Sequence, residues 1–308
     1  MRKQVSLKSP DVGRAYIVTG PTSGIGRRAA FELARHGTVV LVGRNRGKLE
    51  EVQREIQQKG QTAVSVECDL SDIASVRRAA AEIAALRLPI SGLLNNAGVG
   101  GMTGKANAAG WNLTFATNHL GPFALTEALV PHFKDGTNVV FVASGVEDPE
   151  RKLARTAGFR GGRFISVEAS ARGEWKPGGS AVPGMDAYAT SKQCVLAATL
   201  ALARETPRLR FNALEPGFTP NTGLSREVSG PMRFLVKYVL PLFAPFMKYW
   251  STPRRAGRVA AQVLLNASGR TGVYYDERGR PMRGSALAHE AKFQDVVVAE
   301  TRALLARA

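Results

Sequence analysis

The chain has 308 residues, of which 22% are charged and 44% hydrophobic, the composition of an ordinary folded protein. This balance excludes an intrinsically disordered chain and a fibrous repeat. Two cysteines cannot build a disulfide framework and favour a reducing compartment, so a cytoplasmic location is expected. The formal net charge of +17 leaves three interpretations open: a nucleic-acid or anionic-membrane partner, an anionic cofactor, or a generally basic proteome.

Apolar runs rich in β-branched residues alternate with helix-period segments along the chain. Strands are expected over 15–19, 38–42, 62–67, 91–95, 138–143 and 209–214, and helices over 25–36, 46–59, 72–86, 111–133, 187–204 and 253–266. Apolar strands separated by helices are typical of a parallel sheet that is covered on both faces. The pattern therefore predicts one α/β domain over residues 1–308, a doubly wound Rossmann fold with a parallel sheet of seven strands.

Two irregular regions interrupt this alternation. Residues 145–187 are rich in Gly, Pro and charged side chains, and a loop this long inside a compact domain is usually functional. Residues 219–252 hold the most apolar stretch, 231–250. In doubly wound sheets ligands bind beyond the carboxyl ends of the strands, which is where both regions leave the sheet. We expect a substrate-side insertion and a lid, and the many aromatic residues of the lid indicate a bulky hydrophobic substrate.

The stretch 231–250 has a second interpretation. Its uncharged run Tyr238–Met247 is ten residues long, and a spanning helix needs about 20 apolar residues, so no transmembrane segment is predicted. Its three cations would share a narrow helix face, which is typical of a helix lying on an anionic membrane. Pro241 and Pro245 should split such a helix, which favours a two-piece lid over peripheral membrane contact.

A glycine-rich turn follows the first strand. It reads Thr19-Gly20-Pro21-Thr22-Ser23-Gly24-Ile25-Gly26 and runs directly into a helical pattern. Glycines allow a sharp turn and a close approach of the backbone to a pyrophosphate, which then faces the amides of the helix N-terminus. We therefore predict that the turn holds a dinucleotide through Gly20, Thr22, Ser23, Gly24, Ile25 and Gly26.

The end of the second strand identifies the dinucleotide. An NAD site usually places an acidic residue there, bonded to the ribose 2′-hydroxyl. Here Gly43 and Arg44 take that place, followed by Asn45. A carboxylate would repel a 2′-phosphate, whereas a guanidinium pairs with it. The sequence predicts NADP(H), with Arg44 as the main discriminator; a solvated loop arginine is the alternative.

Tyr188 and Lys192 stand four residues apart on a predicted helix and so share one face. A nearby ammonium should lower the tyrosine pKa from about 10 toward neutrality. Tyr188 then becomes a usable general acid for a carbonyl oxygen, or a base in the reverse direction. A Tyr-x-x-x-Lys pair alone is a weak signal.

Together with the other motifs, the sequence resembles the short-chain dehydrogenase/reductase family over essentially the whole chain. The motifs are the glycine turn, Asp69-Leu70, Asn95-Asn96-Ala97-Gly98, Thr117-Asn118-His119-Leu120-Gly121, Ser144, Tyr188 with Lys192, and Pro216-Gly217. The resemblance implies a catalytic tetrad of Asn118, Ser144, Tyr188 and Lys192. It also implies cofactor contacts by Asp69, Leu70, Asn96, Ala97, Gly98, Tyr188, Lys192, Pro216, Gly217 and Thr219.

The implied roles are specific. Ser144 would polarise the substrate carbonyl, and Lys192 would hold the nicotinamide ribose and tune Tyr188. Asn118 would anchor a water that relays protons, a role compatible with distorting its helix. The alternative interpretation of Ser144 is a strand-end cap. No metal site is predicted. Family members often pair through the helices before and after Ser144, so a homodimer is one assembly that the resemblance allows.

The chain also departs from the short family members. The segment between Ser144 and Tyr188 is long, and the turn after the sixth strand ends in Thr222-Gly223-Leu224. These features, with Ser191-Lys192-Gln193-Cys194, are most similar to the protochlorophyllide reductase branch, with retinol dehydrogenases as the neighbouring comparison. Cys194 is more simply interpreted as a buried helix cysteine.

Three functions remain open at this stage. The first is an NADPH-dependent carbonyl reductase or alcohol dehydrogenase for a hydrophobic substrate, and the second is reduction of a conjugated C=C bond. The third, a non-catalytic NADP-sensing module, is disfavoured because the chain keeps both Tyr188 and Lys192. A nucleic-acid partner is not expected, since no finger, basic zipper or RNA-binding motif is present. Residues 1–60 hold 12 Lys and Arg against 5 Asp and Glu, which fits an anionic cofactor at the glycine turn.

Overall fold

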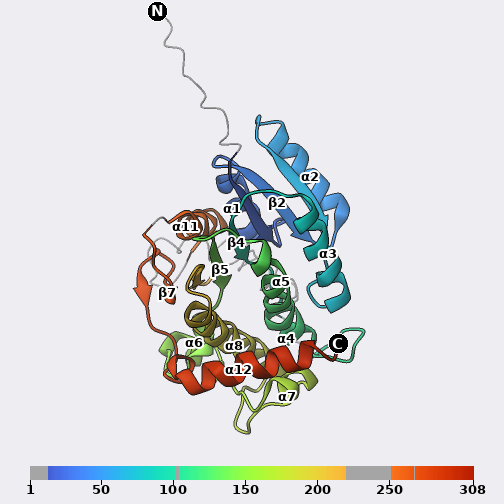
Figure 1. Ribbon diagram of the computed structural model, residues 1–308. Coiled ribbons are helices and arrows are strands. Elements are labelled where there is room, and N and C mark those ends of the chain that lie inside the picture. Colours follow the sequence, from blue (N-terminus) through green and yellow to red (C-terminus); the bar gives the residue numbers. More distant parts are fainter. Residues whose placement is uncertain (1–12, 101–103, 220–250, 267) are drawn as a thin grey trace, which may run out of the picture.

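The computed structural model describes residues 13–100, 104–219, 251–266 and 268–308 (Figure 1). Its strands form one sheet in the order β3-β2-β1-β4-β5-β6-β7-β8. Their bounds are β1 Ala15–Thr19, β2 Thr38–Gly43, β3 Ala63–Glu67, β4 Ile90–Asn95, β5 Asn138–Val142, β6 Arg210–Leu214, β7 Val273–Tyr275 and β8 Pro281–Met282. The order reverses between β1 and β4, as in a doubly wound fold, so the expected α/β Rossmann fold is confirmed.

The expected number of seven strands is corrected to eight. Neighbouring strands from β3 to β7 are all parallel, and β8 runs antiparallel to β7. A tight turn joins these two strands, with Asp276 N–H donating to the Arg280 carbonyl at 2.8 Å. A two-residue strand carries no period that sequence reasoning can detect, and its existence depends on pairing with β7.

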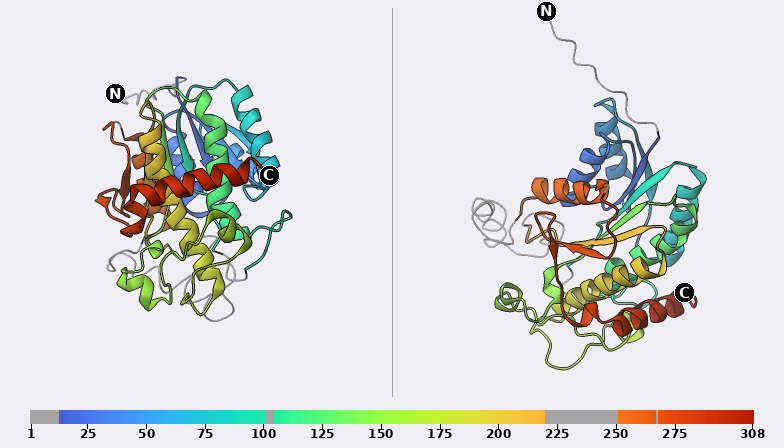
Figure 2. Two further views of the ribbon diagram at one scale, coloured as in Figure 1. Left: turned by 60° about the horizontal axis from the view of Figure 1, so that its bottom comes forward. Right: turned by 60° about the vertical axis from the view of Figure 1, so that its left-hand side comes forward.

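Helices cover both faces of the sheet. One face carries α1 (Gly24–Leu33), α2 (Arg46–Gln57) and α11 (Pro253–Leu265), and the other carries α3 (Ile73–Ala85), α5 (Gly121–Leu129), α8 (Pro183–Glu205) and α12 (Ala291–Leu305). In the right-hand view of Figure 2, α11 lies on one side of the strands, and α8 and α12 lie together on the other. Successive strand residues alternate between the two apolar cores: Ile17 belongs to one and Val18 to the other.

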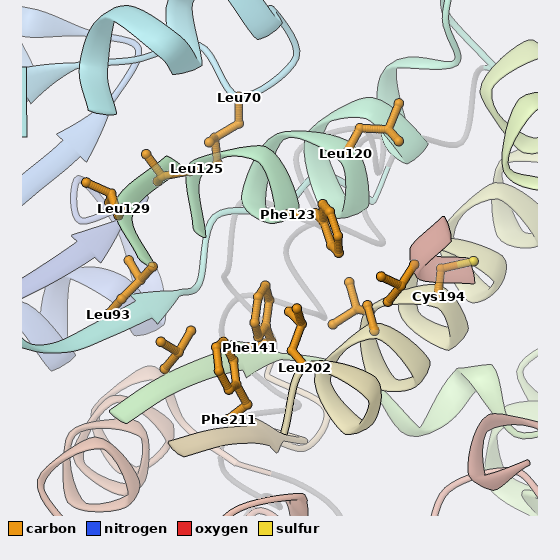
Figure 3. Packing of buried hydrophobic residues seen from close by; sticks show 14 of the residues in the cluster. Leu70, Leu93, Leu120, Phe123, Leu125, Leu129, Phe141, Cys194, Leu202 and Phe211 are labelled. Atoms are coloured by element: carbon orange, nitrogen blue, oxygen red, sulfur yellow. The ribbon is translucent and has the colours of Figure 1, made fainter. Parts of the chain in front are cut away.

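The larger core lies between the sheet, α5 and α8. Figure 3 shows Phe123 of α5 and Leu202 of α8 close to Phe141 of β5, with Phe211 on the neighbouring strand β6. Cys194 of α8 belongs to the same core, and its sulfur points away from these rings. All five side chains are at most 3% exposed. The interpretation of Cys194 as a buried helix cysteine is confirmed.

The helix expected over 111–133 is a composite. It starts as α4 (Leu113–Phe115), capped by the Asn112 side chain, which accepts from Phe115 N–H at 3.0 Å. A π-helical turn, η1 (Ala116–Leu120), follows, then α5 with Pro122 in its first turn, and a 3-10 turn, η2 (Val130–His132). The π turn contains Asn118, as expected from a helix-distorting role, and such turns are frequent at functional sites.

The insertion 145–187 is more ordered than its composition predicts. It contains a 3-10 turn η3 (Gly145–Glu147), α6 (Lys152–Thr156) and α7 (Val167–Arg172), and α8 already starts at Pro183. Of the expected lid, only residue 219 and residues 251–252 are described, and the segment 231–250 lies outside the described residues. Thr252 caps α11 as expected, accepting from Arg255 N–H at 3.2 Å. In the part of the chain that the structure describes, no helix is both long and apolar enough to cross a bilayer.

Candidate active site

The glycine turn connects β1 to α1 in the geometry that a phosphate cradle needs. Gly20 and Gly24 have φ of +68° and +55°, a conformation that side chains rarely adopt. A Cβ on Gly26 would lie 2.3 Å from both the Gly20 carbonyl oxygen and Asn96 Nδ2, so only glycine lets α1 start this close to the turn. Ser23 precedes α1 in an extended conformation, which leaves the first amides of the helix available to an anion.

The Asn95–Gly98 segment holds this turn in place. Thr19 Oγ1 accepts from the backbone N–H groups of Asn96 and Ala97, both at 3.0 Å. The Asn96 side chain donates back to the Thr19 carbonyl at 2.9 Å. These hydrogen bonds join the ends of β1 and β4. The Asn96 side chain thereby holds the glycine turn in its conformation.

A cavity of about 1000 Å³ runs from the glycine turn to the insertion. Sequence-predicted cofactor and catalytic residues line most of it: Gly20, Thr22, Ser23, Gly24, Ile25, Arg44, Asn45, Leu70, Asn96, Ala97, Gly98, Ser144, Tyr188, Lys192, Pro216, Gly217 and Thr219. The predicted site residues Gly26, Asp69 and Asn118 are not part of this lining. We call this space the central cavity.

One end of the central cavity is marked by cations. Arg44 and Lys48 line it and are exposed, and neither side chain makes an ion pair with the residues that the structure describes. Asn45 has a local role, because its side chain caps α2 by accepting from Lys48 N–H at 2.9 Å. Asp69 is also engaged locally, since its Oδ1 accepts from the backbone and the hydroxyl of Ser71 at 2.9 and 2.7 Å.

Ser144, Tyr188 and Lys192 meet at the carboxyl end of β5. Ser144 follows β5, and α8 brings Tyr188 and Lys192 to it from one face of the helix. The Ser144 side chain hydrogen-bonds to Tyr188. Lys192 Nζ donates to the Val142 carbonyl at 2.6 Å and lies 5.6 Å from the centre of the Tyr188 ring. The parallel sheet thus brings together three side chains that are far apart in the sequence.

Burial shifts the pKa of both groups on α8. Desolvation raises the pKa of Tyr188 to about 12; the Ser144 hydrogen bond lowers it and the Glu215 charge raises it further. Desolvation lowers the pKa of Lys192 to about 8. The expected lowering of the tyrosine pKa by the ammonium is therefore wrong for this structure: desolvation is the largest cause of the shift, and Lys192 is not among the groups that change the Tyr188 pKa.

Asn118 lies behind the cluster in the π turn. Its Oδ1 accepts from Val99 N–H at 2.8 Å, and its Nδ2 donates to the Val99 carbonyl at 3.0 Å and to Ser191 Oγ at 3.1 Å. A Cβ on Gly98 would lie 3.2 Å from Asn118 Oδ1 and 3.7 Å from Lys192 Nζ, so both side chains border the same glycine. Asn118 thus fastens the segment after β4 to α8.

Sequence reasoning missed an ion pair in the wall of the cavity. Arg151, from the insertion, and Glu215, at the end of β6, both line it, with Arg151 Nη1 2.8 Å from Glu215 Oε2. Their side chains are only 14% and 8% exposed. Desolvation raises the pKa of Glu215, and the charge of Arg151 lowers it. The one available signal was the glutamate directly before Pro216-Gly217; nothing indicated which residue of the insertion would reach it.

The remaining wall at the insertion end is largely apolar. It is formed by Val146, Leu153, Ala154, Ala157, Phe159, Met185 and Phe218. Leu153 and Phe218 are 42% and 52% exposed, although large apolar side chains are usually covered. Phe159 packs near Tyr188, with ring centres 6.4 Å apart. The catalytic cluster therefore borders an apolar part of the cavity, and exposed apolar side chains lie at the edge of that part.

The cavity fits a nicotinamide dinucleotide in three respects. Glycines with positive φ and a helix N-terminus form one side, as a pyrophosphate needs. Arg44 and Lys48 lie where the second strand ends, the place of an adenosine ribose in this fold. The hydroxyl and ammonium groups of the cluster lie at the opposite, apolar end.

Comparisons with known proteins agree with this geometry. The family model described as short chain dehydrogenase matches residues 14–154. The bovine protein named dehydrogenase/reductase SDR family member 13 is 32% identical over 270 residues, covering 85% of this chain and 63% of that protein. The chain therefore spans less than two thirds of that relative's length.

A chloroplastic protochlorophyllide reductase of Pisum sativum is 28% identical over 285 residues, covering 84% of this chain and 68% of that protein. The crystal structure of a blue fluorescent protein from a metagenomic library, in complex with NADPH, has a TM-score of 0.63 at 23% identity. That match covers 87% of this chain and 97% of the other. With the ordered motifs, the doubly wound sheet and the Ser-Tyr-Lys cluster in one cavity, the chain belongs to the short-chain dehydrogenase/reductase family of oxidoreductases.

Proposed function

We propose that the chain is an NADPH-dependent oxidoreductase that transfers hydride to or from a bulky hydrophobic carbonyl or alcohol. The observation that carries the proposal is the joining of a phosphate cradle and the Ser144, Tyr188 and Lys192 side chains within one cavity of about 1000 Å³. The nicotinamide, when bound, supplies the hydride. The other steps belong to residues of this chain.

Tyr188 supplies the proton. A pKa of about 12 keeps its hydroxyl protonated at neutral pH, as a general acid for a carbonyl oxygen must be. Ser144 hydrogen-bonds the same oxygen as negative charge develops on it. Lys192 binds the nicotinamide ribose, and Asn118 positions Lys192 through the segment after β4 and through Ser191. In the oxidation of an alcohol, Tyr188 takes the proton back.

The preference for NADPH is supported by charge at the end of β2. Arg44 and Lys48 line the cavity there, and Gly43 stands where an NAD site usually has a carboxylate. A 2′-phosphate would be attracted by both cations. The blue fluorescent protein whose crystal structure contains NADPH has the same fold.

The apolar wall of the insertion supports the substrate class. Apart from Lys192 of the catalytic cluster, the charged side chains that line this end in the described residues are Arg151 and Glu215, which form an ion pair. A large hydrophobic molecule would bury its surface against Leu153, Phe159 and Phe218 while its reacting oxygen reaches Tyr188.

The deciding experiment follows NADPH absorbance with a panel of apolar ketones, aldehydes and alcohols and compares the wild type with Tyr188→Phe. Loss of the acid should lower kcat by about 10³-fold, within the usual range for general acid catalysis, and leave the Kd for NADPH nearly unchanged. Tyr275→Phe is the control, because Tyr275 is buried in the core on the other face of the sheet. Turnover by Tyr188→Phe within tenfold of the wild type would break this mechanism.

Reduction of a conjugated C=C bond is the second candidate. It is favoured by the 28% identity with the pea protochlorophyllide reductase across most of this chain. Both reactions need hydride and Tyr188 as an acid, so product analysis separates them. A purified protein with visible absorbance from a bound pigment, or a product that keeps its carbonyl and has lost its C=C bond, supports this second candidate.

A further inference from the structure

Five arginines line a second hollow, separate from the central cavity. It has a volume of about 730 Å³ and is lined by Thr252, Arg254, Arg255, Arg258, Val259, Arg278 and Arg280. Three of the arginines lie in the first two turns of α11 and two in the turn between β7 and β8, which lies beside α11 in Figure 1. All five are exposed. We call these five residues the arginine hollow.

The charge of the hollow is poorly compensated by the residues that the structure describes. Arg278 lies 3.4 Å from Glu277, whereas the other four make no ion pair with the residues that the structure describes. The nearby Asp276 carboxylate is used by backbone, since it accepts from the N–H groups of Arg278 and Arg280, both at 2.8 Å. Arg254 and Arg255 also stand in the first turn of α11, where the helix dipole disfavours cations. Like charges gathered in this way attract a surface of opposite charge.

The hollow adjoins the mouth of the central cavity. Ser251, next to Thr252 of the hollow, donates its backbone N–H to the Phe218 carbonyl at 2.9 Å. Phe218 lines the central cavity and is 52% exposed. Exposed aromatic and cationic side chains together are characteristic of contact with the polar surface of a bilayer. Duplex DNA offers its phosphates to arginine but no apolar environment to Phe218, so the combination favours lipid.

We propose that the arginine hollow docks this corner of the molecule on an anionic lipid surface. The contact sets phosphate-bearing headgroups against the arginines and places Phe218 at the interface. With the proposed function, the docking also brings the apolar mouth to the membrane in which a bulky hydrophobic substrate would be dissolved. That last step rests on the proposed function; the docking does not.

Sedimentation of the full chain with vesicles tests the docking. The vesicles are phosphatidylcholine alone and phosphatidylcholine mixed with phosphatidylglycerol, each at low and at physiological salt. The wild type should bind the mixed vesicles, bind neutral ones weakly, and be released as salt screens the charges. The triple variant R254Q/R255Q/R258Q should lose about 100-fold in partitioning, because each arginine near an anionic surface contributes several-fold.

The matched control is R46Q/R78Q/R172Q, which removes the same charge from α2, α3 and α7. These arginines are exposed by 78%, 72% and 54%, and the control should bind like the wild type. The charge-conserving variant R254K/R255K/R258K should keep most of the binding. Equal loss in the glutamine variant and the control would overturn the proposal in favour of diffuse charge. So would absence of wild-type binding to mixed vesicles at low salt, or preferential binding of duplex DNA.

Two readouts separate this test from the proposed function and from misfolding. The three arginines of α11 are exposed and outside the central cavity. The glutamine variant should therefore keep at least the wild-type Tm, and it should keep the wild-type rate with a water-soluble carbonyl. Lost vesicle binding at an unchanged Tm supports docking whether or not any carbonyl is reduced.

Discussion

At the scale of single residues, Tyr188 and Lys192 show how one helix face can hold two groups that respond oppositely to burial. Desolvation disfavours the phenolate and the ammonium alike, so it raises the pKa of Tyr188 to about 12 and lowers that of Lys192 to about 8. Lys192 needs its charge to attract a ribose hydroxyl or a nearby phosphate, so cofactor affinity should weaken as the pH rises through about 8.

Arg44 gives the first residue-scale prediction. Arg44→Ala should lower kcat/KM for NADPH by roughly 10- to 100-fold, the value of one or two charge-assisted hydrogen bonds, and leave kcat/KM for NADH nearly unchanged. Steady-state kinetics with both cofactors measures this. Arg46→Ala is the control, because Arg46 does not line the central cavity and pairs with Glu50 at 3.0 Å on the surface. Equal use of NADH and NADPH by the wild type would contradict the assignment.

The site was predictable from the sequence where a local motif carries the chemistry. The glycine turn, Ser144 and the Tyr188–Lys192 pair lie together in the cavity as expected. Lys48 was missed because, in the sequence, it resembles any exposed residue of an amphipathic helix. It lines the cavity because it stands in the first turn of α2, next to the end of β2. The Arg151–Glu215 pair was missed because it joins residues 64 positions apart through an insertion without a regular period. The tyrosine pKa was wrong because burial is set by tertiary packing.

At the scale of elements, the insertion acquires its order from contacts rather than from its own pattern. Glu147, in η3, is fully buried and holds the chain before α12: its Oε1 accepts from Ser285 N–H at 2.8 Å and its Oε2 from Ser285 Oγ at 2.5 Å. Its backbone carbonyl accepts from Gly162 N–H at 2.9 Å. Sequence reasoning predicts a loop here because these bonds join segments far apart in the chain. The helices α1, α2, α3, α8 and α11 were predicted to within a few residues, since their buried faces repeat. The helix α12 was not predicted, although its buried face also repeats.

Glu147 gives the element-scale prediction. Desolvation raises its pKa from 4.5 to about 7 despite the Ser285 hydrogen bonds. Between pH 4.5 and 7 the folded chain therefore holds a proton that the unfolded chain has lost, so this group's contribution to stability falls as the pH rises. Above pH 7 the loss is about 3 kcal/mol. Glu147→Gln, which cannot ionise, should gain by up to that amount relative to the wild type between pH 5 and pH 8.

Urea unfolding at a series of pH values measures this gain. Glu150→Gln is the control, because Glu150 belongs to the same insertion and is exposed. Its stability should differ from that of the wild type by a constant amount at every pH. A Glu147→Gln curve parallel to the wild-type curve would show that the buried carboxylate does not titrate in this range.

At the scale of the whole molecule, the position of α12 bears on assembly. This helix packs across α8, as Figures 1 and 2 show, and buries Phe293, Val297 and Val298. Arg302 joins it to both neighbours, donating to Glu127 of α5 at 3.0 and 3.1 Å and to Glu205 of α8 at 2.7 Å. These charge-assisted bonds raise the pKa of Arg302. The outer face of α8 is therefore covered by the chain's C-terminal helix, which also reaches α5 through Arg302.

This cover leads to the last prediction, on the homodimer that the family resemblance allows. A pair formed through α5 and α8 would have to displace α12, exposing Phe293 and Val297 and breaking the bonds of Arg302 to both carboxylates. We expect the full chain to sediment as a single species of 33.0 kDa over a wide concentration range. If the chain sediments at twice that mass while a cross-link still joins α12 to α8 of the same chain, the dimer uses a different pairing surface. If it sediments at twice that mass and α12 no longer cross-links to α8, dimerisation through α5 and α8 is more favourable than the packing of α12.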